Sequence, residues 1–235
     1  MIFDDCAVFD PVSETLVIAD PHFDYPTHPS RGGGPLVSRT VLPRYRTLVS
    51  RYDPSEVVIA GDLFETTHEP PQEAAEAFTE MCDVAYERGA RVVVTPGNHD
   101  RCGVDLLHVL PEPSTPECRL GDGETVVLHG NRSPSESASR FIIGHMHPVV
   151  ECERGVLPSY LYAPEAFQGA DVVVLPAFNY RVQGLPIPEA LNGRANAPIV
   201  RDSLPFSSAE CIGWDAQEGR TVRFALEDVL AGANR

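Results

Sequence analysis

The sequence predicts an α/β fold, because short apolar strands alternate with helical stretches in its first half. Three runs of mainly β-branched residues, at 15–19, 57–60 and 92–94, have the continuous apolar character of strands buried on both faces of a sheet. Helical stretches lie between them, at residues 42–52 and 72–88. Strands and helices that alternate in this order indicate a parallel sheet with crossover helices.

The second predicted helix has the clearer pattern. Ala75, Phe78, Cys82 and Tyr86 recur at helical spacing, and Gly89 follows as a stop signal. We therefore expect one amphipathic helix between the second and third strands.

The second half of the chain predicts a further, mixed sheet. Gly121-Asp122-Gly123 indicates the turn of one hairpin, and Gly219 that of another. The expected strands lie at residues 119–120, 125–128, 141–143, 172–175, 211–214 and 221–226. Residues 179–206, rich in Pro, Gly and Asn, are expected to form a long irregular loop. The length suits a single domain over residues 1–235.

The charge balance is strongly acidic. The chain has 34 acidic residues against 18 basic ones, all arginine, and a net charge of -16. Such an excess keeps a protein soluble where salt screens its self-repulsion, which indicates a halophilic, archaeal source. A GC-rich genome is the alternative explanation of the missing lysine, but it leaves the carboxylate excess unexplained. The acidity also argues, weakly, against a nucleic-acid partner.

The cysteines and the N-terminus limit the remaining classes. None of the six cysteines forms a CxxC pair, so no zinc knuckle or thioredoxin-like motif is indicated. The N-terminus is acidic where a signal peptide is basic, and no apolar run approaches the roughly 20 residues that cross a bilayer. The sequence therefore predicts a cytoplasmic protein with no membrane contact.

Polar side chains of metal-binding type follow five of the predicted strands. A single Asp-x-His, Gly-Asp or His-Gly has little weight, but the five motifs hold five of the eight histidines. Because ligands bind outside the carboxyl ends of strands in open α/β sheets, we expect these residues to meet at one site. The motifs are Asp20-Pro21-His22, Gly61-Asp62, Gly97-Asn98-His99-Asp100, His129-Gly130 and Gly144-His145-Met146-His147.

This series resembles the calcineurin-like metallophosphoesterase superfamily, with motifs that span residues 20–147. The compact length, the run 144–148 and the run 175–179 are most similar to archaeal SbcD-related phosphoesterases and bacterial DNA ligase-associated phosphoesterases. The resemblance implies a four-layer α/β/β/α sandwich of two mixed sheets, over nearly the whole chain.

The resemblance also implies a division of metal ligands. One ion is held by Asp20, His22 and His147, the other by Asn98, His129 and His145, and Asp62 bridges both. A bridging carboxylate suits two ions about 3.5–4 Å apart, the separation used in phosphoryl transfer. Imidazole with carboxylate and amide oxygens suits Mn, Fe, Zn or Co better than calcium, and Mn²⁺ is the ion we expect.

The implied reaction is an in-line attack on phosphorus by a hydroxide that bridges the two ions. His99 is implied to stand by the leaving group, as a general acid or charge stabiliser. Two carboxylates are candidates for orienting it: Glu65, where phosphoprotein phosphatases carry an aspartate, and Asp100. For either carboxylate a helix cap or a turn is the alternative role.

Three further groups of residues offer weaker evidence of a functional role. Asn131 and Arg132 directly follow His129-Gly130, so they are candidates for substrate contact, with a solvated surface role as the alternative. The run Arg31-Gly32-Gly33-Gly34 lacks the context of a phosphate-binding loop and is expected to form a flap near His22. His28, His68 and His108 are expected to have surface or capping roles.

The functional prediction is a metal-dependent phosphoesterase that hydrolyses phosphodiesters, either DNA or RNA or small and cyclic nucleotides. The chain shows no basic stripe or aromatic platform for single strands. A phosphomonoesterase is one alternative. Another is a catalytically silent scaffold in a DNA-repair assembly, but that would predict broken motifs, and here every ligand position is filled. The resemblance suggests a helicase or a ligase as partner.

Overall fold

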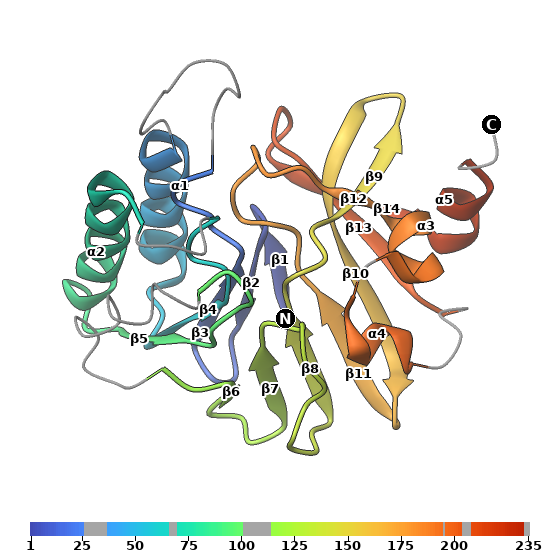
Figure 1. The fold of residues 1–235 in the computed structure, drawn as a ribbon, viewed down its shortest axis with the longest axis horizontal. Coiled ribbons are helices and arrows are strands. Elements are labelled where there is room, and N and C mark those ends of the chain that lie inside the picture. Colours follow the sequence, from blue (N-terminus) through green and yellow to red (C-terminus); the bar gives the residue numbers. More distant parts are fainter. Residues whose placement is uncertain (26–36, 66–69, 101–113, 195, 204–207, 233–235) are drawn as a thin grey trace.

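The computed structural model describes residues 1–25, 37–65, 70–100, 114–194, 196–203 and 208–232. Two β-sheets pack face to face, and helices cover the outer face of each sheet (Figure 1). The four-layer α/β/β/α arrangement that the sequence predicts is therefore confirmed. None of the described helices is long and apolar enough to span a membrane.

The first sheet has the order β1-β2-β3-β4-β5. Its strands are β1 (Ile2–Asp4), β2 (Ala7–Asp10), β3 (Thr15–Ala19), β4 (Glu56–Ala60) and β5 (Arg91–Val94). The last three pair in parallel, as predicted, whereas β1, β2 and β3 form an antiparallel meander. Strands β1 and β2 were not predicted, because they are short and Asp4, Asp5 and Asp10 interrupt their apolar residues.

The continuous apolar character of β3 follows from its position between two layers. Leu16 and Ile18 belong to the core under the helices, whereas Val17 and Ala19 belong to the core between the two sheets. Successive side chains of a strand point to opposite faces, so a strand that is covered on both sides needs apolar residues at every position.

Two helices cover the first sheet: α1 (Val37–Tyr52) and α2 (Gln72–Tyr86). Helix α2 agrees with the prediction and is followed by Gly89 at a φ of 78°. Helix α1 begins five residues before the predicted start at Leu42 and contains Pro43. Proline is favoured in the first turn of a helix, but here Pro43 lies in the interior.

The second sheet is mixed, as predicted. β7, β8 and β11 pair in parallel, and the other pairings, apart from β9 with β12, are antiparallel. Its strands are β6 (Glu117–Arg119), β7 (Thr125–Leu128), β8 (Arg140–Ile143), β9 (Pro148–Cys152), β10 (Gly155–Phe167), β11 (Ala170–Val174), β12 (Leu185–Pro186), β13 (Glu210–Asp215) and β14 (Arg220–Ala225). Both predicted hairpins form, but β9 and β10 were not predicted.

The expected irregular loop at 179–206 has more structure than the sequence suggested. It contains β12, α3 (Ile187–Glu189), a π-helical turn (Ala190–Arg194) and α4 (Pro198–Arg201). Together with α5 (Leu226–Gly232), the helices of this segment cover the outer face of the second sheet, where Ile187 and Ile199 are fully buried. The helices within 179–206 were missed because three to five residues cannot display a helical period.

Candidate metal centre

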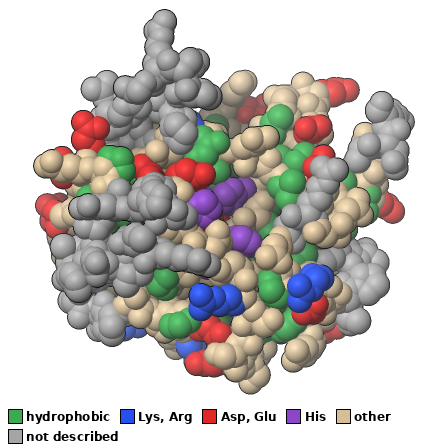
Figure 2. Space-filling model, viewed as in Figure 1, with side chains coloured by type: hydrophobic (Ala, Val, Ile, Leu, Met, Phe, Trp, Pro, Cys, Tyr) green, Lys and Arg blue, Asp and Glu red, His purple; other side chains and the backbone are tan. Residues whose placement is uncertain are grey.

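The residues after β3, β4, β5, β7 and β8 meet at one place, at the carboxyl ends of the parallel strands of both sheets. Figure 2 shows histidine side chains gathered near the middle of one face. Of the eight histidines, His28, His68 and His108 lie outside the described residues, as do Cys102 and residues 31–34. The other five histidines all belong to the motifs at these strand ends.

One cluster consists of Asp20, His22 and His147, whose donor atoms lie within 4.8 Å of one another. Nε2 of His147 is 3.5 Å from Oδ2 of Asp20, and Nδ1 of His22 is 3.0 Å from a carboxylate oxygen of Glu65. Burial opposes ionisation of Asp20, but the neighbouring histidines, His147 first, hold its pKa below the usual value. The cluster thus keeps a buried carboxylate ionised beside two imidazoles.

The second cluster consists of Asp62, His129 and His145, within the same 4.8 Å. Nε2 of His129 lies 3.1 Å from Nδ1 of His145, 3.1 Å from Oδ1 of Asn98 and 3.4 Å from Oδ2 of Asp62. Four donor atoms therefore converge, and the amide of Asn98 lies beside the residues with which the family resemblance groups it.

In the second cluster, the His129 and His145 rings are each oriented by a hydrogen bond to a backbone carbonyl outside the cluster. Nδ1 of His129 donates to the Ala60 carbonyl at 3.0 Å, and Nε2 of His145 donates to the Asn196 carbonyl at 3.2 Å. Each bond fixes the tautomer and leaves the other nitrogen as an acceptor inside the cluster. Burial, followed by the nearby His129, also lowers the pKa of His145, which favours its neutral form.

The two clusters fit a pair of divalent ions. Among the described residues, Oδ1 of Asp20, Nε2 of His22 and Nε2 of His147 are buried without a hydrogen-bond partner. Leaving such atoms unpaired costs free energy, about 1–3 kcal/mol each. Donor atoms about 3 Å apart are also what an ion at about 2.0–2.2 Å from each nitrogen and oxygen would require. The donor set therefore suits two metal ions, one in each cluster.

Glycines allow the ligands to approach one another closely. A Cβ atom on Gly97 would lie 2.0 Å from Oδ1 of Asp62, and one on Gly144 would lie 2.6 Å from Oδ2 of Asp20. A Cβ on Gly61, which has a φ of 75°, would lie 2.3 Å from Nδ1 of His129. The glycine that opens each of these three motifs is thus required by the packing of a ligand from another motif.

The backbone at the site is strained. Five of the residues in the two clusters adopt a positive φ, which non-glycine residues rarely do: Asp20, His22, Asp62, His145 and His147. Such a conformation costs about 1–3 kcal/mol per residue and persists where surrounding structure enforces it. This concentration of strain at one place is an independent indication of a functional site.

His99 is oriented by a main-chain group. Its Nδ1 donates to the carbonyl of Glu65 at 2.6 Å, and its backbone N–H donates to Oδ1 of Asp62. Burial lowers the pKa of His99, but the Glu65 carbonyl and nearby carboxylates outweigh this and raise it. The Glu65 carboxylate contacts His22 instead. The Asp100 carboxylate accepts from the N–H groups of Leu63 and Gly97, so it braces the loop.

Asn131 and Arg132 directly follow His129-Gly130. Asn131 is half-buried and Arg132 is exposed. No hydrogen bond or ion pair of either side chain occurs among the residues that the structure describes, so both are free to meet a ligand or solvent.

Sequence reasoning missed a support for the site that comes from residues 177–179. The Phe178 N–H donates to the Ala19 carbonyl at 2.7 Å, and Nδ2 of buried Asn179 donates to the His22 carbonyl at 3.3 Å. Arg44 of α1 donates to the Phe178 carbonyl at 2.6 Å and stacks on Tyr180. The run 175–179 entered the sequence analysis only through a resemblance, and no local pattern pairs it with Arg44.

Comparison with known proteins gives the following matches. The family model described as calcineurin-like phosphoesterase matches residues 14–166, well over half of the chain. One similar structure is the crystal structure of Pseudomonas putida nuclease MPE, whose sequence is 20% identical. The match covers 94% of this chain and 92% of the nuclease chain, with a TM-score of 0.63. The E. coli phosphoesterase Yfce is 16% identical, covers 90% and 98% respectively and has a TM-score of 0.43. No curated protein matches. The similarity to the nuclease MPE structure supports the α/β fold with two mixed sheets.

Proposed function

We propose that this chain, which belongs to the calcineurin-like phosphoesterase family and is therefore a metallophosphoesterase, hydrolyses phosphodiesters at a centre of two divalent ions. The observation that carries the proposal is the pair of His/Asp clusters, each with donor atoms within 4.8 Å. The proposed ligands are Asp20, His22 and His147 for one ion, Asn98, His129 and His145 for the other, and Asp62 for both.

The ions would supply Lewis-acid activation of water and neutralise charge on the phosphoryl group. The chain's own residues supply orientation. His99 donates from Nδ1 to the Glu65 carbonyl, so Nε2 is the atom that can pass a proton to the leaving oxygen. Glu65 acts twice, since its carbonyl orients His99 and its carboxylate contacts His22. Asp100 contributes by holding the loop that carries Asn98 and His99.

The substrate class follows from resemblance rather than from the metal clusters. The run 144–148 and the run 175–179 resemble SbcD-related and DNA ligase-associated phosphoesterases, and one similar structure is that of a nuclease. We therefore propose nucleotide-containing diesters as substrates, Mn²⁺ as the ion and a helicase or ligase as partner. Asn131 and Arg132 are proposed to contact the substrate. The acidic composition supports a halophilic source.

The test is a hydrolysis assay in molar KCl with bis-p-nitrophenyl phosphate and p-nitrophenyl phosphate. We expect Mn²⁺-dependent cleavage of the diester, loss of activity with a chelator, and recovery when Mn²⁺ is returned. Asp62→Asn should abolish the activity and lower the bound metal measured by elemental analysis. Asp53→Asn, at an exposed carboxylate, is the control and should retain both.

The other outcomes identify the alternatives. Cleavage of the monoester alone would contradict the diester proposal and indicate a phosphomonoesterase. Two bound metal ions without turnover of any phosphate ester would favour the scaffold. A protein that binds no Mn²⁺, Fe²⁺, Co²⁺ or Zn²⁺ would contradict the dinuclear centre itself.

A further inference from the structure

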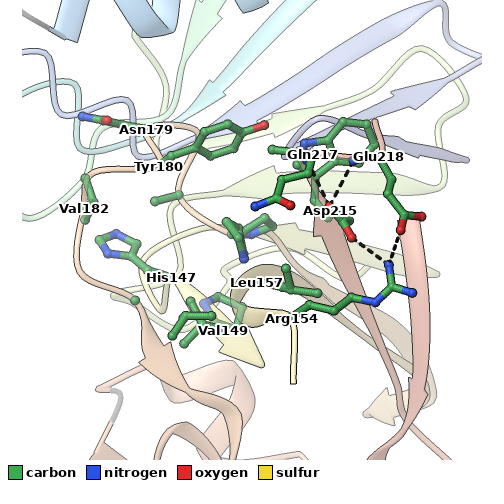
Figure 3. Close-up of a pocket in the computed structure, with 18 residues that line it drawn as sticks. His147, Val149, Arg154, Leu157, Asn179, Tyr180, Val182, Asp215, Gln217 and Glu218 are labelled. Carbon is green, nitrogen blue, oxygen red and sulfur yellow. Dashed lines mark hydrogen bonds and ion pairs between the residues drawn. The ribbon is translucent and has the colours of Figure 1, made fainter. Parts of the chain in front are cut away.

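A cavity of about 480 Å³ opens directly beside the candidate metal centre (Figure 3). His147 of the first cluster and Asn179, which holds the His22 carbonyl, line it at the end nearest the metal centre. We propose that this cavity binds an uncharged aromatic group of the substrate, a single nucleoside attached to the phosphate. The inference rests on the function proposed above and names the part of the substrate that lies next to the ions.

Apolar and aromatic side chains form part of the cavity wall, beside polar ones. Val149, Leu157 and Val182 line the cavity together with Tyr180 and Trp214. Trp214 is only 7% exposed, and its indole Nε1 has no hydrogen-bond partner among the described residues. Pockets for planar ligands typically combine apolar and aromatic walls with a few polar groups.

The charged groups at the far end are already paired with one another. The guanidinium of Arg154 lies 2.9 Å from Asp215 and 2.8 Å from Glu218 (Figure 3). Glu218 also pairs with Arg220 at 2.5 Å, so two guanidinium groups balance two carboxylates. None of these four groups is left as an unpaired cation that would attract a further phosphate, so this end suits an uncharged group better than an anionic one.

The polar side chains suit the edge of a base. The side-chain amide of Gln217 lines the cavity and has no hydrogen-bond partner among the described residues. An amide both donates and accepts, as the edges of nucleobases do. Asn179 cannot serve in the same way, because its amide is already bonded to the His22 carbonyl and the Arg181 N–H. Gln217 is therefore the residue that would read the base.

The single tryptophan of the chain makes this inference directly testable, since Trp214 lines the cavity. Metal-free protein is titrated with adenosine and, separately, with ribose, while tryptophan fluorescence is excited where adenosine does not absorb. We expect a saturable change with adenosine and none with ribose. Val182→Phe, at a half-buried loop position, should weaken adenosine binding about tenfold by narrowing the cavity. Val12→Phe, at a 76% exposed position far along the chain, is the matched control.

A second arm uses diesters with the same leaving group. The kcat/KM for thymidine 5′-(p-nitrophenyl) phosphate should exceed that for methyl p-nitrophenyl phosphate by about tenfold, the effect of one base contact with an aromatic wall. Val182→Phe should remove the preference, whereas Val12→Phe, outside the cavity, should keep it. An octyl ester cleaved as well as the thymidine ester would overturn the proposal in favour of an alkyl pocket.

The two arms separate this inference from the proposed function. If metal-free protein binds adenosine but the metal-loaded protein hydrolyses no diester, the nucleoside-binding cavity is supported and the proposed diesterase activity is contradicted. Hydrolysis of both esters at equal rates, with no fluorescence change, would retain the diesterase and overturn the nucleoside cavity.

Discussion

At the scale of single residues, the metal centre depends on positions where no side chain fits. Gly97, Gly61 and Gly144 each face a ligand from another motif at less than 3 Å from where a Cβ would stand. Their neighbours Asp62 and His145 hold positive φ angles. Both features bring groups from separate strand ends into contact, at the expense of backbone freedom.

Gly97→Ala should therefore disable the site. The new Cβ would lie 2.0 Å from Oδ1 of Asp62, so this carboxylate must move from its place between the clusters. We expect bound metal to fall and hydrolysis to drop at least about tenfold, as for misplaced catalytic groups. Gly121→Ala, whose Cβ would meet Ser13 at 3.7 Å, is the control and should keep both. Full activity of Gly97→Ala would contradict the assigned packing.

Asp122 allows a prediction of pH dependence away from the metal centre. Its carboxylate accepts from the N–H groups of Glu124 and Thr125 and from the Thr125 hydroxyl. Partial burial raises the pKa of Asp122, but these bonds outweigh it and hold the pKa below the usual value. The stabilisation is therefore present above the unfolded-state pKa and is lost as the pH falls through the lower, folded-state value.

Asp122→Asn should lower the free energy of unfolding at neutral pH by up to about 1 kcal/mol, since solvent screens this turn. The difference from the wild type should shrink as the pH falls below about 3.9, the ordinary aspartate pKa. Thermal unfolding in molar KCl across this pH range measures it. A difference that does not change with pH would show that the charge of Asp122 has no part in the effect.

At the scale of elements, α1 is connected to the metal centre through Arg44. Its guanidinium binds Asp5 at 2.8 Å and the Phe178 carbonyl at 2.6 Å, and Tyr180 both stacks on it and bonds to Asp5. The segment it holds includes Asn179, which donates to the His22 carbonyl. Arg44 of α1 thus holds the segment 178–180, and Asn179 in this segment supports the candidate ligand His22.

Arg44→Met should affect both stability and activity. It leaves Asp5 without its cation and the Phe178 carbonyl without this donor in a largely buried place, which costs about 3 kcal/mol. We expect a lower unfolding midpoint and, in the folded enzyme, about tenfold lower kcat with weaker metal binding. Arg46→Met, on the same helix with an exposed Glu80 partner, is the control and should cost less than about 1 kcal/mol. Equal effects of the two changes would reject this role of Arg44.

At the scale of the whole molecule, the charge of -16 sets the conditions in which the fold is stable. Repulsion among the carboxylates destabilises the compact state at low salt, and molar salt shortens its range to about 3 Å. We expect the unfolding midpoint to rise by several degrees between dilute buffer and molar KCl. Equal osmolarity of a neutral solute should not reproduce the rise. A midpoint independent of KCl would remove the support for a halophilic origin.

The fold was predictable wherever an element has a clear local pattern. Continuous apolar runs mark β3, β4 and β5, helical spacing marks α2, and glycine turns mark the two hairpins, and the structure confirms them. The missed elements were β1, β2, β9, β10 and β12, the helices α3, α4 and α5, and the π-helical turn. Most of them have too few residues to show a pattern, whereas β10 is a 13-residue strand that pairs with three partners.

The sequence by itself determined which residues gather at the centre, because metal-binding side chains follow strands whose carboxyl ends must share one edge. Their exact ligand roles remain a prediction. Tertiary structure alone decided what lies around them. Glu65 reaches His99 through its carbonyl, and Arg44 meets Phe178 across 134 positions of sequence. The cavity beside His147 also joins residues from β9 to β13. Contacts between distant segments depend on packing geometry, which no local pattern encodes.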